Sequence, residues 1–253
     1  MACIHLVAQS KGGVGTSFVA AMLAQYQQRP LNQQGPTGRA GARPRPLCID
    51  TDRLHATLAG FQGLGVQCLP LPENGALDAR GVATLLEWIA SARADVIIDC
   101  HARVFGPLLH HLAEHAVPRL LRSLGHSLFI HTVVVGGQAF AETLQGFSQV
   151  LDLFPEQVLF VVWLNPFWGE VVHAGTGFEQ QPAYTLRQRR VCALVRIPRL
   201  AQATDGRALA DMLQQRLTFR EALAMGSRSI LARQRLKIIQ DRLFAQLDNA
   251  RLL

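Results

Sequence analysis

Short apolar segments alternate with longer segments of helical period along most of the chain. The apolar segments predict β-strands, at 4–8, 47–49, 66–69, 95–98, 128–135, 158–164 and 193–197. The other periodic segments predict helices, at 17–28, 78–93, 107–124, 137–154, 204–217 and 227–253. Strands that are apolar throughout are typical of a parallel sheet whose two faces are both covered. The pattern therefore predicts a single α/β domain over residues 1–253, with a doubly wound, mostly parallel sheet flanked by helices.

Composition narrows the class of protein without naming an activity. Of the 253 residues, 49% are hydrophobic and 17% are charged, which excludes a disordered chain. The counts of glycine (21), proline (12) and cysteine (5) exclude collagen-like and disulfide-scaffold classes. The cysteines are scattered and form no C-x-x-C pair, as expected of reduced thiols in a cytoplasm. The apolar segments are too short for a membrane helix, and the first residues lack the pattern of a signal peptide.

The strongest local signal for chemistry is a glycine-rich loop between the first predicted strand and the first predicted helix. Glycines in such a loop let backbone N–H groups turn inward and hold a polyphosphate at the positive end of the helix dipole. A hydroxyl that closes the loop can bind Mg²⁺. A plain glycine-rich turn is the alternative. We predict an ATP site in which Ser17 also holds Mg²⁺, formed by Gly12, Gly13, Val14, Gly15, Thr16 and Ser17.

This loop departs from the standard phosphate loop, G-x-x-x-x-G-K-[ST], at two positions. Ser10 replaces the first glycine, and Thr16 replaces the lysine whose ammonium normally reaches the β- and γ-phosphates. Lys11 lies early in the loop, which resembles the deviant phosphate loop of the ParA/MinD group, K-G-G-x-G-K-[ST]. The resemblance implies that Lys11 is catalytic and reaches the phosphates of a partner subunit across an ATP-bound homodimer. The missing charge at Thr16 is expected to weaken ATP binding and slow hydrolysis, by about 1.5–3 kcal/mol for such a contact.

Polar residues follow three of the predicted strands, where the carboxyl ends of parallel strands face a ligand crevice. Asp50 is predicted to be catalytic and to orient the attacking water. Asp52 and Asp99 are predicted to support Mg²⁺, and Asp99 ends an apolar strand as a Walker B carboxylate does. Asp52 could also cap a helix. Asn165 is predicted to contact the adenine through its amide, or to be a turn residue before a proline.

The chain as a whole resembles the TraL family of conjugal-transfer proteins from broad-host-range plasmids, a ParA/MinD-like family. The stretch Trp-Leu-Asn-Pro-Phe-Trp-Gly at 163–169 is more specific than any phosphate loop. The resemblance covers nearly the whole chain, and the matching stretches are 4–7, 47–52, 56–61, 131–137, 160–169, 206–214, 216–219 and 233–236.

This resemblance implies a P-loop NTPase fold and a cytoplasmic, plasmid-encoded accessory protein of conjugal transfer. It implies ATP and Mg²⁺ as cofactors, an ATP-dependent homodimer, and contacts with proteins of the conjugation machinery. An active protein would be a Mg²⁺-dependent ATPase, impaired by Thr16. The chain departs from the family at Thr16, at residues 100–103 and in a longer arm at 27–46. A non-hydrolysing scaffold that docks a relaxosome or secretion component is the alternative.

Arginine dominates the positive charge, since Lys11 and Lys237 are the only lysines among 25 basic residues. We predict a flexible loop at 27–46 rich in arginine, glycine and proline, and a basic amphipathic helix at 227–253. A basic cluster also surrounds the last strand at 187–199. These segments are interpreted as solvated surface, and nonspecific DNA contact by a partition protein is the competing interpretation.

One further motif points to metal chemistry. His111, Glu114 and His115 match the zinc pattern H-x-x-E-H, and the two histidines would share one face of a helix. A zinc enzyme needs a third ligand and a cleft at that place. We therefore interpret the segment as an exposed polar face of a helix.

Overall fold

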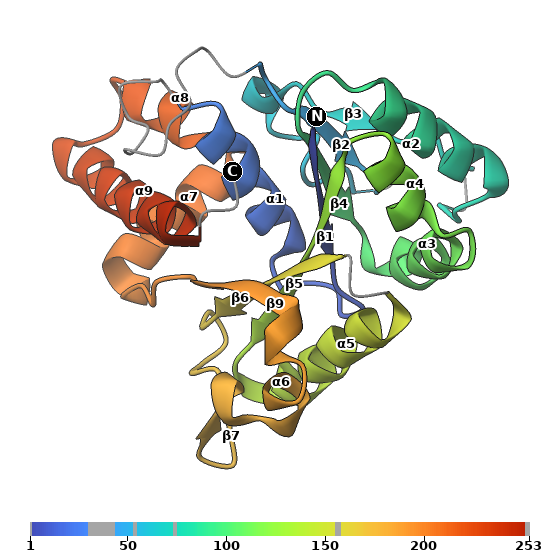
Figure 1. Ribbon diagram of the computed structural model, residues 1–253. Coiled ribbons are helices and arrows are strands. Elements are labelled where there is room, and N and C mark those ends of the chain that lie inside the picture. Colours follow the sequence, from blue (N-terminus) through green and yellow to red (C-terminus); the bar gives the residue numbers. More distant parts are fainter. Residues whose placement is uncertain (1, 30–43, 53–54, 73–74, 155–157, 251–253) are drawn as a thin grey trace.

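The computed structural model describes residues 2–29, 44–52, 55–72, 75–154 and 158–250. Within these residues, seven strands form one parallel sheet in the order β3-β2-β4-β1-β5-β6-β9 (Figure 1). The strands are β1 (Cys3–Ala8), β2 (Leu47–Asp50), β3 (Gln67–Cys68), β4 (Val96–Cys100), β5 (Ser127–Val135), β6 (Leu159–Asn165) and β9 (Val191–Arg196). All seven predicted strands are present, and the predicted doubly wound α/β fold is confirmed.

Helices cover both faces of this sheet. One face packs against α2 (Ala79–Ser91), α3 (Ala102–Glu114), α4 (Val117–Ser123) and α5 (Phe140–Leu153). The other face packs against α1 (Thr16–Gln27), α7 (Arg207–Gln214), α8 (Phe219–Ala224) and α9 (Ile230–Ala250). In Figure 1, α1, α7, α8 and α9 lie on one side of the strands, and α2, α3 and α4 lie on the other.

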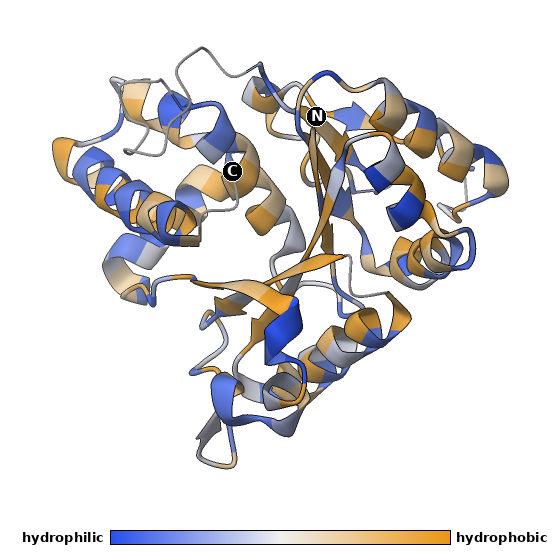
Figure 2. Cartoon of the chain, in the orientation of Figure 1, coloured by the Kyte–Doolittle hydropathy of each residue, from blue (hydrophilic) through white to orange (hydrophobic). Residues whose placement is uncertain are grey.

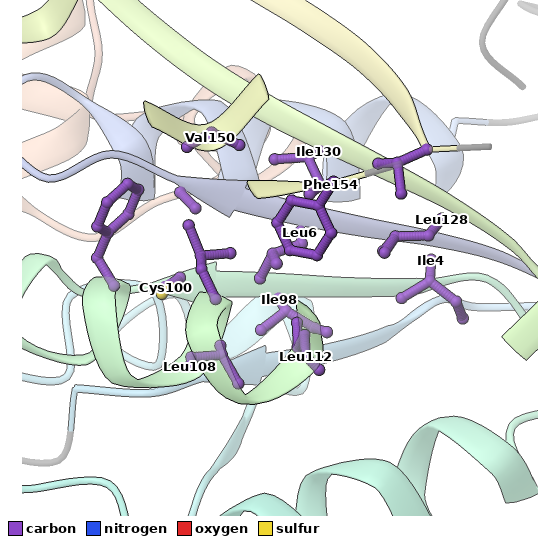
Figure 3. Close-up of a cluster of buried hydrophobic side chains, with 14 of the residues drawn as sticks. Ile4, Leu6, Ile98, Cys100, Leu108, Leu112, Leu128, Ile130, Val150 and Phe154 are labelled. Atoms are coloured by element: carbon purple, nitrogen blue, oxygen red, sulfur yellow. The ribbon is translucent and has the colours of Figure 1, made fainter. Parts of the chain in front are cut away.

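The alternation of side chains along each strand explains the two cores. Ile4, Leu6 and Ala8 of β1 lie in the core under α3 and α5, whereas Val7 lies in the core under α1 and α9. Figure 3 shows the first of these cores, where Leu108 and Leu112 of α3 lie close to strand residues. Because both faces of the sheet are buried, each side chain of a central strand must be apolar or hydrogen-bonded within the chain.

The predicted helix at 107–124 is wrong as a single element. The structure has α3 and α4, separated at Ala116, whose φ of 47° is left-handed and cannot continue a helix. The predicted helix at 204–217 is a π-helical turn (Gln202–Gly206) followed by α7. Such breaks depend on tertiary packing, which the period of the apolar residues does not report.

Several small elements were not predicted. They are α8, α6 (Pro182–Thr185), a hairpin of β7 (Val172–His173) and β8 (Thr176–Gly177), and 3₁₀ turns at Gln62–Leu64, Phe178–Gln180 and Gln188–Arg190. The predicted helix at 137–154 begins with a 3₁₀ turn at Gly137–Ala139 and continues as α5. The hairpin pairs two residues with two, which is too short to leave a periodic pattern. Of the predicted arm at 27–46, residues 30–43 lie outside the described residues, as do residues 251–253 at the end of the predicted terminal helix.

The terminal helix α9 is buried along part of its surface. Leu236, Ile239 and Leu243 are buried against the sheet side, whereas Ile230 and Leu231 near its start are exposed. Figure 2 shows hydrophobic residues concentrated along the strands of the sheet. Along α9 the same figure shows hydrophilic and hydrophobic residues mixed. None of the described helices is long and apolar enough to cross a membrane.

Candidate functional site

The glycine-rich loop lies where β1 ends and α1 begins, at the carboxyl edge of the parallel strands. Gly13 and Gly15 have left-handed φ angles of 76° and 102°, and Gly15 is the N-cap of α1. A Cβ at Gly15 would also lie 3.1 Å from Nδ2 of Asn165. Other residues would be strained at these two positions, so the backbone course of the loop depends on glycine. The N–H groups that open α1 are consequently directed at the edge of the sheet.

Gln9, which the sequence analysis did not single out, anchors the start of this loop. Its buried Nε2 donates to the carbonyl of Val133 at 2.8 Å and to the carbonyl of Thr143 at 3.1 Å. Its Oε1 accepts from the Ser10 N–H at 2.8 Å. The approach requires a glycine on α5, because a Cβ at Gly146 would lie 1.9 Å from Oε1 of Gln9. A polar amide at the end of an otherwise apolar strand was the signal that could have found this residue.

Asp99 is a buried carboxylate at the carboxyl end of β4, and its side chain hydrogen-bonds to Ser17 at the start of α1. Asp99 is 4% exposed, and its Oδ1 has no hydrogen-bond partner. Burial raises the pKa of Asp99 to about 7; the Ser17 hydrogen bond opposes this rise, while the charges of Asp50 and Asp52 add to it. A buried carboxylate with an unused oxygen and a neighbouring hydroxyl fits a hard divalent cation such as Mg²⁺.

Asp50 stands next to Asp99 in the register of β2 and β4. Its Oδ1 accepts from the Asp52 N–H at 2.8 Å, and its Oδ2 accepts from the N–H groups of Leu58 and Ala59 at 2.9 and 3.0 Å. Burial raises the pKa of Asp50, and these three hydrogen bonds oppose the rise. The carboxylate therefore fixes the backbone that follows β2. Its predicted role in orienting a water molecule stays a prediction.

Asp52 is bound by two histidines that the sequence analysis did not predict. Its Oδ2 lies 3.1 Å from Nδ1 of His55 and 3.3 Å from Nε2 of His101. Burial alone would raise the pKa of Asp52, but the hydrogen bonds of His55 and the charges of both histidines lower it overall. Asp52 also accepts from the His55 N–H at 3.1 Å, and it is not the N-cap of any described helix.

Asn165 ties the end of β6 to the glycine-rich loop. Its Nδ2 donates to the carbonyl of Val14 at 2.9 Å, and its Oδ1 accepts from the Phe167 N–H at 3.1 Å. The predicted turn role is therefore present, and the predicted contact with adenine stays a prediction. A hollow of about 500 Å³ lies beside it, lined in part by Phe167 and Trp168, whose exposed rings pack edge to face.

Lys11 extends toward α5. Its Nζ forms an ion pair with Glu142 at 3.0 Å, and the two side chains are 41% and 52% exposed. Thr16, which stands in the place of the usual lysine, is the first residue of α1. The predicted residues from Lys11 to Ser17 thus gather with Asp99, Asp50 and Asn165 at one edge of the sheet.

Most arginines of the cluster around the last strand have carboxylate or carbonyl partners. Arg187 binds Asp152, Arg196 binds Glu179, Arg199 binds Glu170, and Arg190 donates to the carbonyls of Leu151 and Phe154. On α9, Lys237 pairs with Asp241 and Arg235 with Asp205. These contacts favour the interpretation of this charge as surface structure.

His111 and His115 stack with ring centroids 4.0 Å apart on α3, as two residues on one helical face should. Among the described residues, no third metal ligand completes a group with them. Glu114 and His115 are exposed and His111 is half-buried, so these polar side chains lie on a solvent-facing side of α3.

The seven-stranded parallel sheet and the glycine-rich loop before α1 define an α/β protein of P-loop NTPase-like architecture. The chain belongs to the TraL family. It is 49% identical over 253 residues to Protein TraL from Escherichia coli and 48% identical to a second Protein TraL from that organism, with all of both chains covered in each case. No protein-family model matches the chain.

Proposed function

We propose that this protein is a nucleotide-binding accessory factor of plasmid conjugal transfer. Mg²⁺-ATP binds at the glycine-rich loop and stabilises a homodimer, which contacts the transfer machinery in the cytoplasm. Hydrolysis is weakened or lost. The conjugal role rests on membership of the TraL family. The observation that carries the nucleotide part is the buried, unpartnered Oδ1 of Asp99, with the Ser17 hydroxyl beside it at the start of α1.

Each site residue has a defined task in this proposal. The backbone from Gly12 to Thr16 holds the phosphates, because its N–H groups lie at a helix N-terminus. Ser17 and Asp99 hold Mg²⁺, which when bound offsets the negative charge of the phosphates. Asp50 keeps the segment after β2 in place and orients water. The base lies beside Asn165, near the hollow lined by Phe167 and Trp168.

Lys11 has to exchange partners in the dimer. In the single chain its ammonium is held by Glu142 in a half-exposed ion pair. Pairs of this kind contribute about 0–1 kcal/mol, so a phosphate of the partner subunit can displace Glu142 at little cost. ATP would thus link loop occupancy to dimerisation through a single lysine.

The direct test is calorimetric titration of the purified protein with ATP in the presence and absence of Mg²⁺, combined with mass measurement by light scattering. We expect Mg²⁺-dependent binding and a doubling of mass with ATP. Lys11→Ala should bind ATP and remain a monomer. Lys237→Ala is the matched control, because Lys237 is a half-exposed lysine paired with Asp241 on α9; it should dimerise normally.

Thr16→Lys restores the charge that the loop lacks. Because a well-made charged phosphate contact contributes about 1.5–3 kcal/mol, the variant should bind ATP roughly 10–100-fold more tightly and hydrolyse it faster. Thr16→Met adds length without charge and should leave the affinity unchanged. An unaltered affinity in Thr16→Lys would contradict this account of the loop.

The absence of a lysine at position 16 also favours a second candidate, a scaffold that does not hydrolyse nucleotide. Such a protein would dock a relaxosome or secretion component through its folded surface. No ATP binding by the wild-type protein or by Thr16→Lys, with the fold intact, would support the scaffold. Salt-sensitive DNA binding without nucleotide would instead support a DNA-binding partition protein.

A further inference from the structure

Asp52, His55 and His101 form a cluster just beyond the carboxyl ends of β2 and β4, and we call it the histidine–aspartate cluster. The loop after β2 supplies Asp52 and His55, and the N-cap position of α3 supplies His101. One ligand atom from each residue lies within 4.8 Å of the other two. The side chains of Asp52, His101 and His55 are 11%, 32% and 63% exposed, so an ion can enter from solvent.

We propose that the histidine–aspartate cluster is a binding site for a borderline divalent transition-metal ion of the zinc class. It is a separate site from the magnesium site at Ser17 and Asp99. The ion would hold the loop after β2 against the start of α3.

The distances between the donor atoms support this proposal. In a tetrahedral zinc site with bonds of about 2.0–2.1 Å, neighbouring ligand atoms lie about 3.3–3.4 Å apart. Oδ2 of Asp52 is already 3.1 Å from Nδ1 of His55 and 3.3 Å from Nε2 of His101. The gap between the two imidazole nitrogens, within 4.8 Å, has to close by a small movement of the exposed His55 ring. The open side of the cluster leaves room for water as the fourth ligand.

The chemistry of the donors selects the ion. Two imidazoles and one carboxylate suit Zn²⁺, Co²⁺, Ni²⁺ or Fe²⁺, whereas Mg²⁺ prefers oxygen ligands and keeps its water. The same carboxylate was predicted to support Mg²⁺. In this proposal Asp52 serves the transition metal, and the unpaired oxygen of Asp99 remains for Mg²⁺.

A second group with three possible ligands, Cys3, His5 and Asp95, is a poorer candidate, because its buried histidine cannot relocate its proton as the more exposed histidines of the cluster can. The indole N–H of Trp163 donates to Nδ1 of His131, so the neutral His131 carries its proton on Nε2 and donates it to Nδ1 of His5. His5 then carries a proton on Nε2, the atom that would face a metal. His5, His131 and Trp163 are all fully buried, so these protons cannot be exchanged with solvent in the folded protein.

Metal binding at the cluster requires two such protons to move, one on Nδ1 of His55 and one on Nε2 of His101, and the second movement gives a specific signature. Nδ1 of His101 now accepts the Arg103 N–H at 3.3 Å, which is long for a hydrogen bond. When Nε2 binds the ion, the proton of the neutral ring moves to Nδ1 and this contact to Arg103 is lost. The proton of the His55 ring, which Nδ1 now donates to Asp52, has to move to Nε2 in the same way, and the exposed ring can exchange it with solvent. The amide of Arg103 should therefore report on occupancy.

The test is titration of the full-length, metal-free protein with Co²⁺, read by the visible absorption of the bound ion, and then displacement by Zn²⁺. It is carried out without nucleotide and with Mg²⁺ present, so failure of the nucleotide proposal would not affect it. Binding of one ion per chain is expected, together with a shift of the Arg103 amide signal in the NMR spectrum.

Two ligand variants and one control make this test specific. His55→Ala and His101→Ala should each weaken Co²⁺ binding by at least the roughly 10–100-fold that loss of an outer-shell partner costs elsewhere. The double variant His111→Ala/His115→Ala removes the exposed histidine pair on α3 and should bind Co²⁺ as the wild type does. His55 is exposed, so its variant remains informative even if His101→Ala does not fold.

Equal Co²⁺ affinity in the wild type and in His55→Ala would overturn the proposal. So would loss of binding in the control variant, which would place the ion on α3. Occupancy by Mg²⁺ with the same affinity as Co²⁺ would also overturn it, because the donors would then not discriminate between the two ions.

Discussion

Two buried polar clusters in neighbouring strands of the same sheet behave in opposite ways. In the interior, His5 of β1 and His131 of β5 share a hydrogen bond of 2.9 Å, and Trp163 of β6 donates to His131 at 3.0 Å. At the carboxyl edge, Asp99 and Asp50 stand side by side, and Oδ1 of Asp99 has no partner. The interior cluster joins three strands with neutral groups, whereas the edge cluster collects negative charge.

The pKa values express the same difference. Burial lowers the pKa of His5 to about 3 and that of His131 well below its usual value, so both rings are neutral in the folded protein. Burial raises the pKa of Asp99 to about 7. Nε2 of His5 also lacks a hydrogen-bond partner, but a neutral ring costs less to bury than a carboxylate, whose negative charge destabilises the fold unless a cation binds. A cation would therefore find a negatively charged, unpaired oxygen at the edge of the sheet, whereas the interior rings are neutral.

The largest expected effect follows from Asp99→Asn. The pKa of Asp99 is raised in the folded protein above its unfolded value of 3.8. The contribution of Asp99 to the free energy of unfolding is therefore fully present below pH 3.8 and is lost as the pH rises through about 7. The variant should therefore be more stable than the wild type near pH 8, by up to about 4 kcal/mol in the absence of Mg²⁺. Urea unfolding at pH 8 and pH 5 measures the difference, which should shrink at the lower pH. Equal free energies of unfolding for the wild type and Asp99→Asn at pH 8 would show that burying the ionised carboxylate does not destabilise the fold.

The interior cluster should have the opposite dependence on pH. The pKa of His5 is lowered in the folded protein, so its neutral form contributes stability that is lost as the pH falls below about 6.5. His5 alone should account for about 2 kcal/mol between pH 6.5 and pH 5, and His131 acts in the same direction. The measurement is best made in Asp99→Asn, where the opposing titration of Asp99 is absent. Unchanged stability over this range would contradict the assignment of neutral rings.

A smaller effect is expected from Gln9→Leu, which tests the anchor between the two clusters. The substitution leaves buried carbonyls of Val133 and Thr143 without the amide donor, and should lower the free energy of unfolding by about 1–3 kcal/mol. The matched control is Gln234→Leu on the exposed side of α9, which should change little. Thermal unfolding of both variants provides the comparison. Equal melting temperatures would remove Gln9 from the account of the loop.

The smallest effect is expected at the arginine surface. Arg196→Gln breaks an ion pair with Glu179 that is about half exposed, and Arg199→Gln breaks a more exposed ion pair with Glu170. Each variant should therefore change the free energy of unfolding by less than about 1 kcal/mol. Urea unfolding at low and high salt measures this. A loss of several kcal/mol in either variant would mean that these pairs organise the last strand.

Much of the fold could be predicted because strands buried on both faces leave unbroken apolar segments. All seven predicted strands lie in the sheet, and the glycine-rich loop lies between the expected strand and helix. The break at Ala116 and the β7-β8 hairpin could not be predicted, since a left-handed alanine and two-residue strands leave no periodic signal.

The sequence predicted which acidic and amide side chains lie in the candidate site, but not the contacts that hold them in place. Asp50, Asp52, Asp99 and Asn165 were found because they end strands. Gln9, His55 and His101 were missed because their importance lies in contacts between segments far apart in sequence, such as Asp52 with His101. A position at the end of a strand does not by itself specify a contact with a ligand. The predicted ligand contacts of Asp50 and Asn165 therefore stay predictions.

We propose above that the unpaired oxygen of Asp99 holds a magnesium ion together with bound ATP. The most direct measurement is ATP titration of the wild type and of Asp99→Asn by calorimetry, with and without Mg²⁺. We predict that Mg²⁺ tightens ATP binding in the wild type and that Asp99→Asn loses this gain, about 1.5–3 kcal/mol, while remaining folded. Equal ATP affinity in both proteins, with Mg²⁺ present, would contradict the claim and leave the edge of the sheet without its proposed ligand.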